Sequence, residues 1–266
     1  MAGRSTYVYG IARLVRVVPR EVFVMEQMSR WDFLGRSVAA MAGAAVFGLA
    51  GSGQADPGPE AGKLVPPGQQ EVMPLPYAYD ALKGLSQQVV TWHHDTHYAG
   101  YVKNRNAIEK ALAAMDPQSA TFNAGTFAGL KKQETFNTCG QILHEVYFSN
   151  LGGDGQADPN LKVAAALQRD FGSLAAWQAD LRATAMGAGI GWGVTCWDPS
   201  SGRLINFLVE LHQMGAIWAA VPIVALDGWE HAFYHDYGPS KNKYFDVFFQ
   251  NLHWGRIDAR FTAASG

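Results

Sequence analysis

The sequence has little cysteine, little charge and no long apolar run, and each scarcity excludes a class of protein. Two cysteines among 266 residues, Cys139 and Cys196, are too few for a disulfide framework, and we expect them to be separate, buried and reduced. A net charge of −2 gives no sign of a nucleic-acid partner. Internal repeats and low-complexity tracts are also missing. A hydrophobic content of 48% is instead enough for a sizeable core in one or two compact units.

The first 55 residues differ in charge from the rest and are typical of an export signal. They carry six Arg and three acidic residues, whereas the remainder has a net charge of −5. Two arginines precede a short apolar run at 38–50, and Gly53-Gln54-Ala55 offers small residues for cleavage. We therefore expect residues 1–55 to be removed, and the mature chain to be periplasmic or secreted, without membrane contact.

Several variants of this prediction stay open. Ser29 to Leu34 resembles a twin-arginine signal, but Trp31 stands where the second arginine belongs, so Sec export is equally open. The apolar run is short and rich in Gly and Ala for a membrane span. An uncleaved anchor or a cytoplasmic chain remains an alternative, as does translation from Met25 or Met28.

Beyond the signal, the patterning predicts an α+β fold in two parts. Residues 56–73 are rich in Pro, Gly and Gln and predict an extended leader. Apolar residues at helical spacing predict long helices at about 86–115 and 125–151, an antiparallel helical hairpin within a domain spanning 74–151. The Gly- and Asp-rich stretch after residue 151 predicts a domain boundary.

Residues 152–266 predict an α+β domain with a three-stranded antiparallel sheet. Alternating apolar residues and turn signals indicate the strands. The expected elements are helices at about 161–169 and 173–186, strands at 191–197, 203–211 and 221–227, and closing helices at 243–251 and 254–261.

Three segments carry residues suited to one metal ion. Asp227 and His231 lie four positions apart, so one helical or near-helical turn can aim both at a single point, although a surface pair is the commoner arrangement. His93 lies on one predicted helix and His144 on the next, in a mostly apolar pattern where a lone histidine is usually a core residue. A shared centre explains all four economically. Three imidazoles and a carboxylate suit iron, manganese or zinc by donor type.

These segments, with Gly191-Trp192-Gly193, occur in the order seen in iron/manganese superoxide dismutases, and Pro74 to Leu82 resembles that family's N-terminal segment. The resemblance runs from about Met73 to Phe261. It implies an enzyme that disproportionates superoxide to dioxygen and hydrogen peroxide by one-electron cycling of a single iron or manganese ion per subunit. It also implies a homodimer or homotetramer. The implied metal ligands are His93, His144, Asp227 and His231.

The resemblance also implies roles around the metal. His97 and Tyr101, which follow His93 at i+4 and i+8, match the family's outer histidine and gateway tyrosine, which relay protons. Trp192, Trp229 and Phe148 correspond to the apolar wall that controls dielectric and solvent access.

Two further residues match a subunit interface. Glu230 and Tyr234 correspond to family residues that couple two active sites across a dimer: the glutamate reaches the partner's histidine ligand, and the tyrosine reaches the partner's outer histidine.

His212 is where this chain departs from the family pattern. Manganese members place a glutamine there that hydrogen-bonds the metal-bound solvent. Iron members supply a glutamine four residues before the second histidine ligand; that position is Gly140 here, and Gln141 is about 100° further round the helix. We expect His212 to take this role and to tune the reduction potential, which leaves the choice of iron or manganese open.

Two other functions stay open. A zinc-dependent hydrolase needs an open metal position and a nearby unliganded glutamate as base; Glu145 and Glu230 adjoin ligands but leave a helix in other directions. A catalytically weak, metal-binding relative predicts loss of His97, Tyr101 or the tryptophan wall, and none of these is lost.

Overall fold

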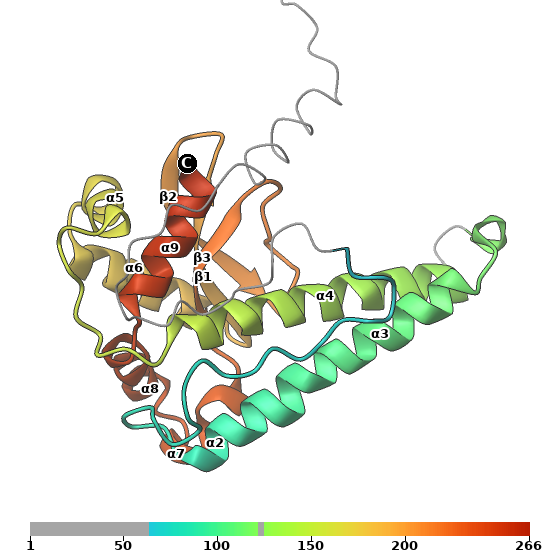
Figure 1. The fold of residues 1–266 in the computed structure, drawn as a ribbon, viewed down its shortest axis with the longest axis horizontal. Coiled ribbons are helices and arrows are strands. Elements are labelled where there is room, and N and C mark those ends of the chain that lie inside the picture. Colours follow the sequence, from blue (N-terminus) through green and yellow to red (C-terminus); the bar gives the residue numbers. More distant parts are fainter. Residues whose placement is uncertain (1–63, 122–124) are drawn as a thin grey trace, which may run out of the picture. The chain divides into compact units, whose positions relative to one another are not determined.

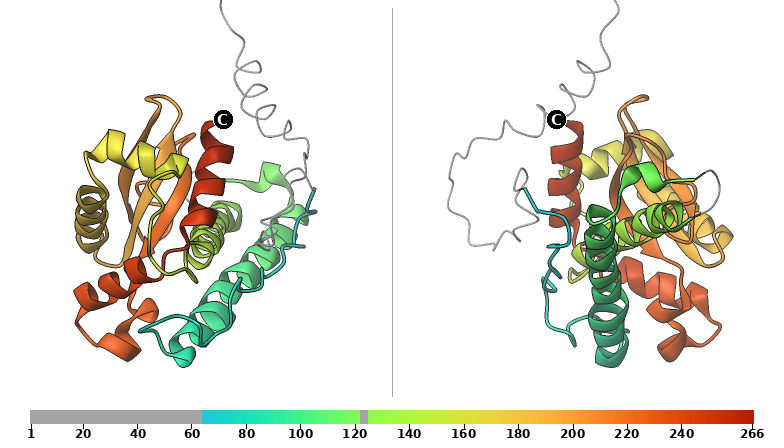
Figure 2. Two further views of the ribbon diagram at one scale, coloured as in Figure 1. Left: turned by 60° about the vertical axis from the view of Figure 1, so that its left-hand side comes forward. Right: turned by 90° about the vertical axis from the view of Figure 1, so that its right-hand side faces the viewer.

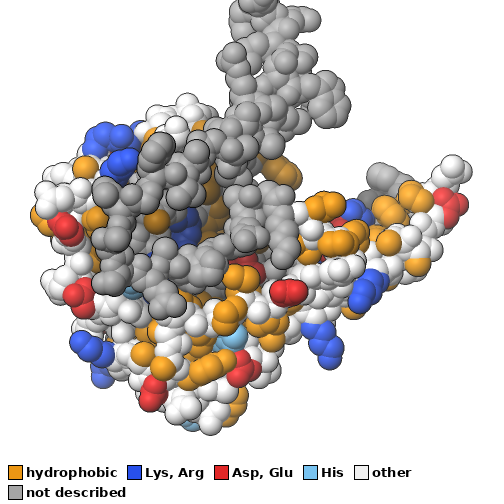
Figure 3. Space-filling model, viewed as in Figure 1, with side chains coloured by type: hydrophobic (Ala, Val, Ile, Leu, Met, Phe, Trp, Pro, Cys, Tyr) orange, Lys and Arg blue, Asp and Glu red, His pale blue; other side chains and the backbone are white. Residues whose placement is uncertain are grey.

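The computed structural model describes residues 64–121 and 125–266, so the predicted signal at 1–55 lies outside the described residues (Figure 1). Its first half is the predicted helical hairpin. The elements are α2 (Gln87–Thr91), the π-helix η1 (Trp92–Tyr98), α3 (Ala99–Ala113), the 3₁₀ turn η2 (Pro117–Ser119) and α4 (Thr126–Asn150). Figure 1 shows α3 and α4 running side by side, and basic and acidic side chains are interspersed along them in Figure 3.

The first helix differs from its prediction in one respect. It begins where expected, because Ser86 Oγ accepts a hydrogen bond from Val89 N at 3.2 Å and caps the first turn. The expectation of an uninterrupted α-helix from 86 to 115 was wrong, since residues 92–98 form a π-helix. π-Helical turns are rare and frequently occur at functional sites. This one carries His93 and His97.

The second half is the predicted α+β arrangement. Its helices and strands are α5 (Lys162–Phe171), α6 (Leu174–Gly187), β1 (Gly191–Asp198), β2 (Arg203–Glu210), β3 (Val221–Asp227), η3 (Glu230–Ala232), α7 (Tyr234–Tyr237), α8 (Lys241–Gln250) and α9 (Trp254–Ser265). In this second half α6 packs on β1 and β2. The helix α4, which belongs to the first half, packs on β3 (Figure 2). The patterning missed only the short turns η3 and α7, which follow the third strand.

The three strands form an antiparallel sheet in the order β2-β1-β3, which confirms the predicted sheet. Its central strand, β1, is buried from Gly191 to Cys196. A Cβ on Gly193 would lie 2.8 Å from the Leu181 carbonyl, so a glycine is needed where α6 crosses the strand. Trp192 on β1 pairs with Asp227 at the end of β3, and this register places an aromatic wall beside a carboxylate.

Residues 64–86 contain no helix or strand and run along the hairpin, held by side chains of the first helix. Asn106 pairs with both backbone groups of Gln70, and Tyr98 Oη accepts from Met73 N at 2.9 Å. The division of the chain at residue 152 stays a prediction. Within the described ranges, no helix is long and apolar enough to cross a membrane. Both cysteines are free, but Cys139 is only half-buried, contrary to expectation.

Candidate metal centre

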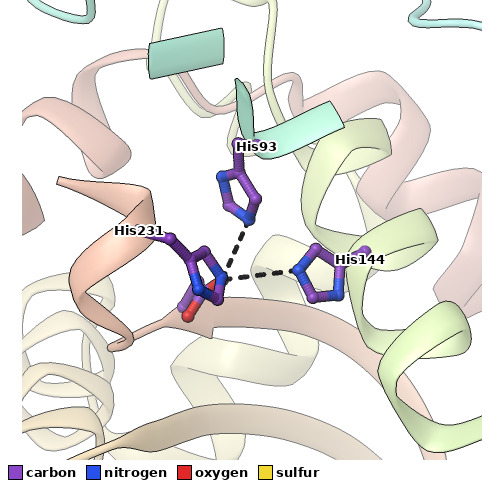
Figure 4. Close-up of side chains that lie close together, drawn as sticks. His93, His144 and His231 are labelled. Atoms are coloured by element: carbon purple, nitrogen blue, oxygen red, sulfur yellow. Dashed lines mark hydrogen bonds and ion pairs between the residues drawn. The ribbon is translucent and has the colours of Figure 1, made fainter. Parts of the chain in front are cut away.

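Four side chains from four elements meet at one point, and they are the four predicted ligands. His93 comes from η1, His144 from the middle of α4, Asp227 from the end of β3 and His231 from η3. One donor atom from each lies within 4.8 Å of all the others. Figure 4 shows the three imidazoles converging from different directions.

The distances suit donors that share one ion. Asp227 Oδ2 lies 3.1 Å from His93 Nε2, 3.2 Å from His231 Nε2 and 3.9 Å from His144 Nε2. Two donors each about 2.1 Å from a metal are about 3.0 Å apart at 90° and about 3.6 Å apart at 120°. The carboxylate and the imidazoles therefore surround a space of metal-ion size.

Two of the donors have no other partner. The Nε2 atoms of His93 and His144 are buried without a hydrogen bond, which is rare for buried polar atoms. His144 Nδ1 donates to the Gly140 carbonyl at 2.7 Å, which leaves the Nε2 lone pair for the centre. Asp227 Oδ1 accepts from Trp229 N at 2.8 Å, so only Oδ2 faces inward. This pattern fits a bound metal.

The electrostatics keep the donors in their ligating forms. Burial lowers the pKa of His93 to about 4 and holds the pKa of His144 well below its ordinary value, so both rings are neutral near pH 7. Burial would raise the pKa of Asp227, but the attraction of His231 and His93, whose Nε2 atoms lie 3.2 and 3.1 Å from its Oδ2, holds it well below its usual range. The centre offers neutral imidazoles and one anion.

His212 links Trp192 to Tyr101, the predicted gateway residue. Trp192 Nε1 donates to His212 Nδ1 at 3.0 Å, and an indole nitrogen can only donate. Burial lowers the pKa of His212 to about 4, so the ring is neutral and carries its hydrogen on Nε2. Nε2 lies 2.6 Å from Tyr101 Oη and donates to it. The hydroxyl hydrogen of Tyr101 must then point elsewhere.

The backbone before His212 is strained into place. Leu211 has a φ of +53°, a left-handed conformation that a leucine rarely adopts. Its amide donates to the Ile190 carbonyl at 3.2 Å, and its carbonyl accepts from Trp229 Nε1 at 3.2 Å. These contacts hold the turn that aims His212 inward.

Gly140 has no side chain to offer the centre, and it instead provides room for Tyr101. A Cβ at Gly140 would lie 2.7 Å from the Tyr101 ring, so the absence of a side chain lets that ring pack on α4. Gln141 points elsewhere and donates to Glu145 at 2.8 Å. The imidazole of His212 therefore occupies the position beside Tyr101.

The predicted wall and outer residues surround the ligands. The Phe148 ring lies 5.0 Å from His93, Trp192 lies 5.0 Å from His144, and Trp229 stacks on His231 at 5.7 Å. His97 stacks on His231 at 4.1 Å.

Comparison with known proteins agrees with this geometry. Residues 69–152 match the α-hairpin domain of iron/manganese superoxide dismutases, and residues 159–260 match the C-terminal domain of the same proteins. The chain belongs to the iron/manganese superoxide dismutase family.

A relative named as a manganese enzyme and a relative named as an iron enzyme are about equally similar to this chain. The chain is 42% identical over 195 residues to a manganese superoxide dismutase of Haloferax volcanii, covering 73% of this chain and 96% of the relative. It is 41% identical over 196 residues to an iron superoxide dismutase of Cupriavidus metallidurans, covering 73% and 97%. An iron enzyme of Aquifex pyrophilus is 35% identical over 186 residues, covering 69% and 87%. Overall identity therefore does not decide between iron and manganese.

The predicted interface residues lie at the surface of the chain. Glu230 is exposed, and Tyr234 keeps 55% of its surface accessible. Both line an open pocket of about 470 Å³ that reaches the ligand His231, together with His97 and Trp92. The pocket therefore connects the ligand His231 with the surface of a single chain.

Two residues near the centre were missed from the sequence. Tyr147 is buried 4.9 Å from the His93 ring, one turn after His144, and helical spacing from that ligand could have found it. Lys241 approaches Gly228, next to Asp227, and the linear pattern gives no sign of this contact.

Proposed function

We propose that this chain disproportionates superoxide at the centre formed by His93, His144, Asp227 and His231. The observation that carries the proposal is the pair of buried Nε2 atoms without hydrogen bonds, aimed at an anionic carboxylate oxygen. Iron or manganese held there supplies one-electron cycling between the divalent and trivalent states, which zinc cannot. Two superoxide anions and two protons then yield one dioxygen and one hydrogen peroxide.

The surrounding residues deliver protons and exclude water. Because His212 donates to Tyr101, the tyrosine is free to donate its own hydroxyl hydrogen towards an acceptor at the centre. His97, stacked on His231 at the pocket, stands between the centre and solvent and passes protons inward. The Trp192 and Phe148 rings keep bulk water away from the ligands, which strengthens every charge interaction inside.

A hydrolytic zinc site is disfavoured by the positions of the acids. Glu145 Oε1 accepts hydrogen bonds from Tyr98 Oη at 3.0 Å and from Gln141 at 2.8 Å, so it is engaged away from the centre. Glu230 faces solvent. Neither carboxylate is placed to activate a water molecule on the metal.

Metal analysis and an activity assay on the purified chain test the proposal. We expect one iron or manganese ion per chain, and His93→Ala, His144→Ala, Asp227→Ala and His231→Ala should each lose both metal and dismutase activity. Asp80→Ala is the matched control, because this exposed carboxylate lies outside the four-residue centre and does not line the pocket. Full metal occupancy in any two of the ligand variants would mean that the centre is misassigned.

We also propose that a second copy of the chain covers the pocket. Tyr234 is large and exposed, and Glu230 directly precedes the ligand His231. Both residues therefore suit an interface that links the metal centres of two copies. Light scattering should give a dimer or tetramer for the native chain, and Glu230→Ala with Tyr234→Ala should shift it towards smaller species. A native chain that is monomeric at micromolar concentration contradicts this assembly.

Finally, we propose that residues 1–55 direct export to the periplasm or medium. The arginine-containing segment, the short apolar run and the small residues ending at Ala55 support this. Amino-terminal sequencing of protein from cell fractions should find a chain beginning near Asp56 outside the cytoplasm. A purely cytoplasmic pool retaining Met28 contradicts it.

A further inference from the structure

Lys241 places a positive charge against the backbone beside the metal centre. Its Nζ donates to the carbonyls of Gly189, at 2.6 Å, and of Ala185, at 3.4 Å, where α6 ends. Carbonyls at a helix C-terminus favour a cation. The ammonium also lies 5.8 Å from the centre of the Phe245 ring.

The ammonium lies against the backbone of residue 228, which directly follows the ligand Asp227, because residue 228 is glycine. A Cβ at Gly228 would lie 2.8 Å from Lys241 Nζ and 3.1 Å from its Cε, so a side chain there would displace the ammonium. Burial lowers the pKa of Lys241, whereas the fields of Asp227 and Glu230 act in the opposite direction. Lys241 and Asp227 therefore interact electrostatically without touching.

No carboxylate in the described part of the chain forms an ion pair with Lys241. Its hydrogen-bond partners are neutral carbonyls, and the anions Asp227 and Glu230 act on it only through space. Half-buried charges are screened less than exposed ones. The field of the ammonium reaches the centre, where the charge of a bound iron or manganese ion would change by one in each half of the reaction.

We propose that Lys241 sets the reduction potential of the metal centre. A fixed positive charge beside Asp227 disfavours the trivalent ion more than the divalent ion, because repulsion grows with the charge of the ion. The ammonium thus raises the reduction potential. Lys241 acts on the metal through its electric field and contacts neither substrate nor ligand, so it is not a catalytic residue. This role rests on the proposed function.

The test is a redox titration of the metal-loaded full chain, followed spectroscopically, with Lys241→Gln and Lys241→Met. Glutamine keeps a donor for the Gly189 carbonyl but loses the charge, whereas methionine loses both. We expect the midpoint potential to fall in both variants at unchanged metal content, and to stay near the native value in Lys241→Arg. Lys243→Gln is the matched control, because it removes the same charge from an exposed position on the same helix.

A potential in Lys241→Gln equal to the native one, with metal bound, overturns the proposal. An equal fall in Lys243→Gln also overturns it, since that result would reflect net charge alone. If Lys241→Met fails to fold, Lys241→Gln carries the measurement. A native chain that binds no redox-active metal contradicts the proposed function instead, so the two failures are distinguishable.

Discussion

At the scale of single residues, the sequence predicted that His212 lies near the centre, but the tautomer of its imidazole depends on neighbours that only the structure shows. The motif order placed an imidazole near the centre, where it lies between Trp192 and Tyr101. The tautomer follows from the Trp192 donor, which no sequence pattern reveals. The left-handed turn at Leu211 was equally hidden, because leucine gives no signal for positive φ.

Replacing His212 by glutamine should preserve the chain of hydrogen bonds. An amide can accept from Trp192 and donate to Tyr101, so metal should stay bound. The electronic character of the donor changes, and we expect the ratio of iron-loaded to manganese-loaded activity to shift. His212→Ala should instead destabilise the fold by about 1–3 kcal/mol, because it leaves the buried Trp192 donor unpaired. Activity assays on both metal forms and urea unfolding measure the two effects; an unchanged activity ratio in His212→Gln refutes the assigned role.

At the scale of elements, the patterning predicted the hairpin, the three strands and the closing helices because each has a continuous apolar face. The π-helix at 92–98 could not be predicted, since its wider hydrogen bonding leaves no compositional trace. The turns around Glu230 are too short for periodicity. The order of the motifs along the sequence was enough to predict the ligand residues. The packing of α4 on β3 could be seen only in the structure.

Asn150 ties α4 to β3. Its Oδ1 accepts from Ala225 N at 2.9 Å, and its Nδ2 donates to the Ile223 carbonyl at 3.1 Å, all buried. Asn150→Ala should lower the free energy of unfolding by about 1–3 kcal/mol, because the buried Ala225 N–H loses its acceptor, whereas the Ile223 carbonyl keeps its hydrogen bond from Arg260 at 2.7 Å. Metal affinity should fall too, since His144 and Asp227 lie on the two tied elements. The control is Asn160→Ala at an exposed position, which should lower the free energy of unfolding by under about 0.5 kcal/mol. Urea unfolding measures both variants, and equal losses of stability would show that Asn150 does not hold α4 to β3.

At the scale of the whole molecule, the buried imidazoles couple metal-free stability to pH. Burial lowers the pKa of both His93 and His212 to about 4, against about 6.5 in an unfolded chain. Between these values the unfolded state binds more protons, so stability rises with pH across this window and is lost as pH falls from about 6.5 towards 4. Each ring can contribute up to about 3 kcal/mol.

Urea unfolding of the metal-free chain between pH 8 and pH 4.5 measures this loss. We expect a nearly constant midpoint above about pH 7.5 and a steady fall below pH 6.5. A separate, metal-loaded sample should release its metal over the same range, because protons compete for the donors. His212→Gln should flatten the slope, since an amide does not titrate. A midpoint that rises on acidification to pH 5 would show that the imidazoles are charged in the folded chain.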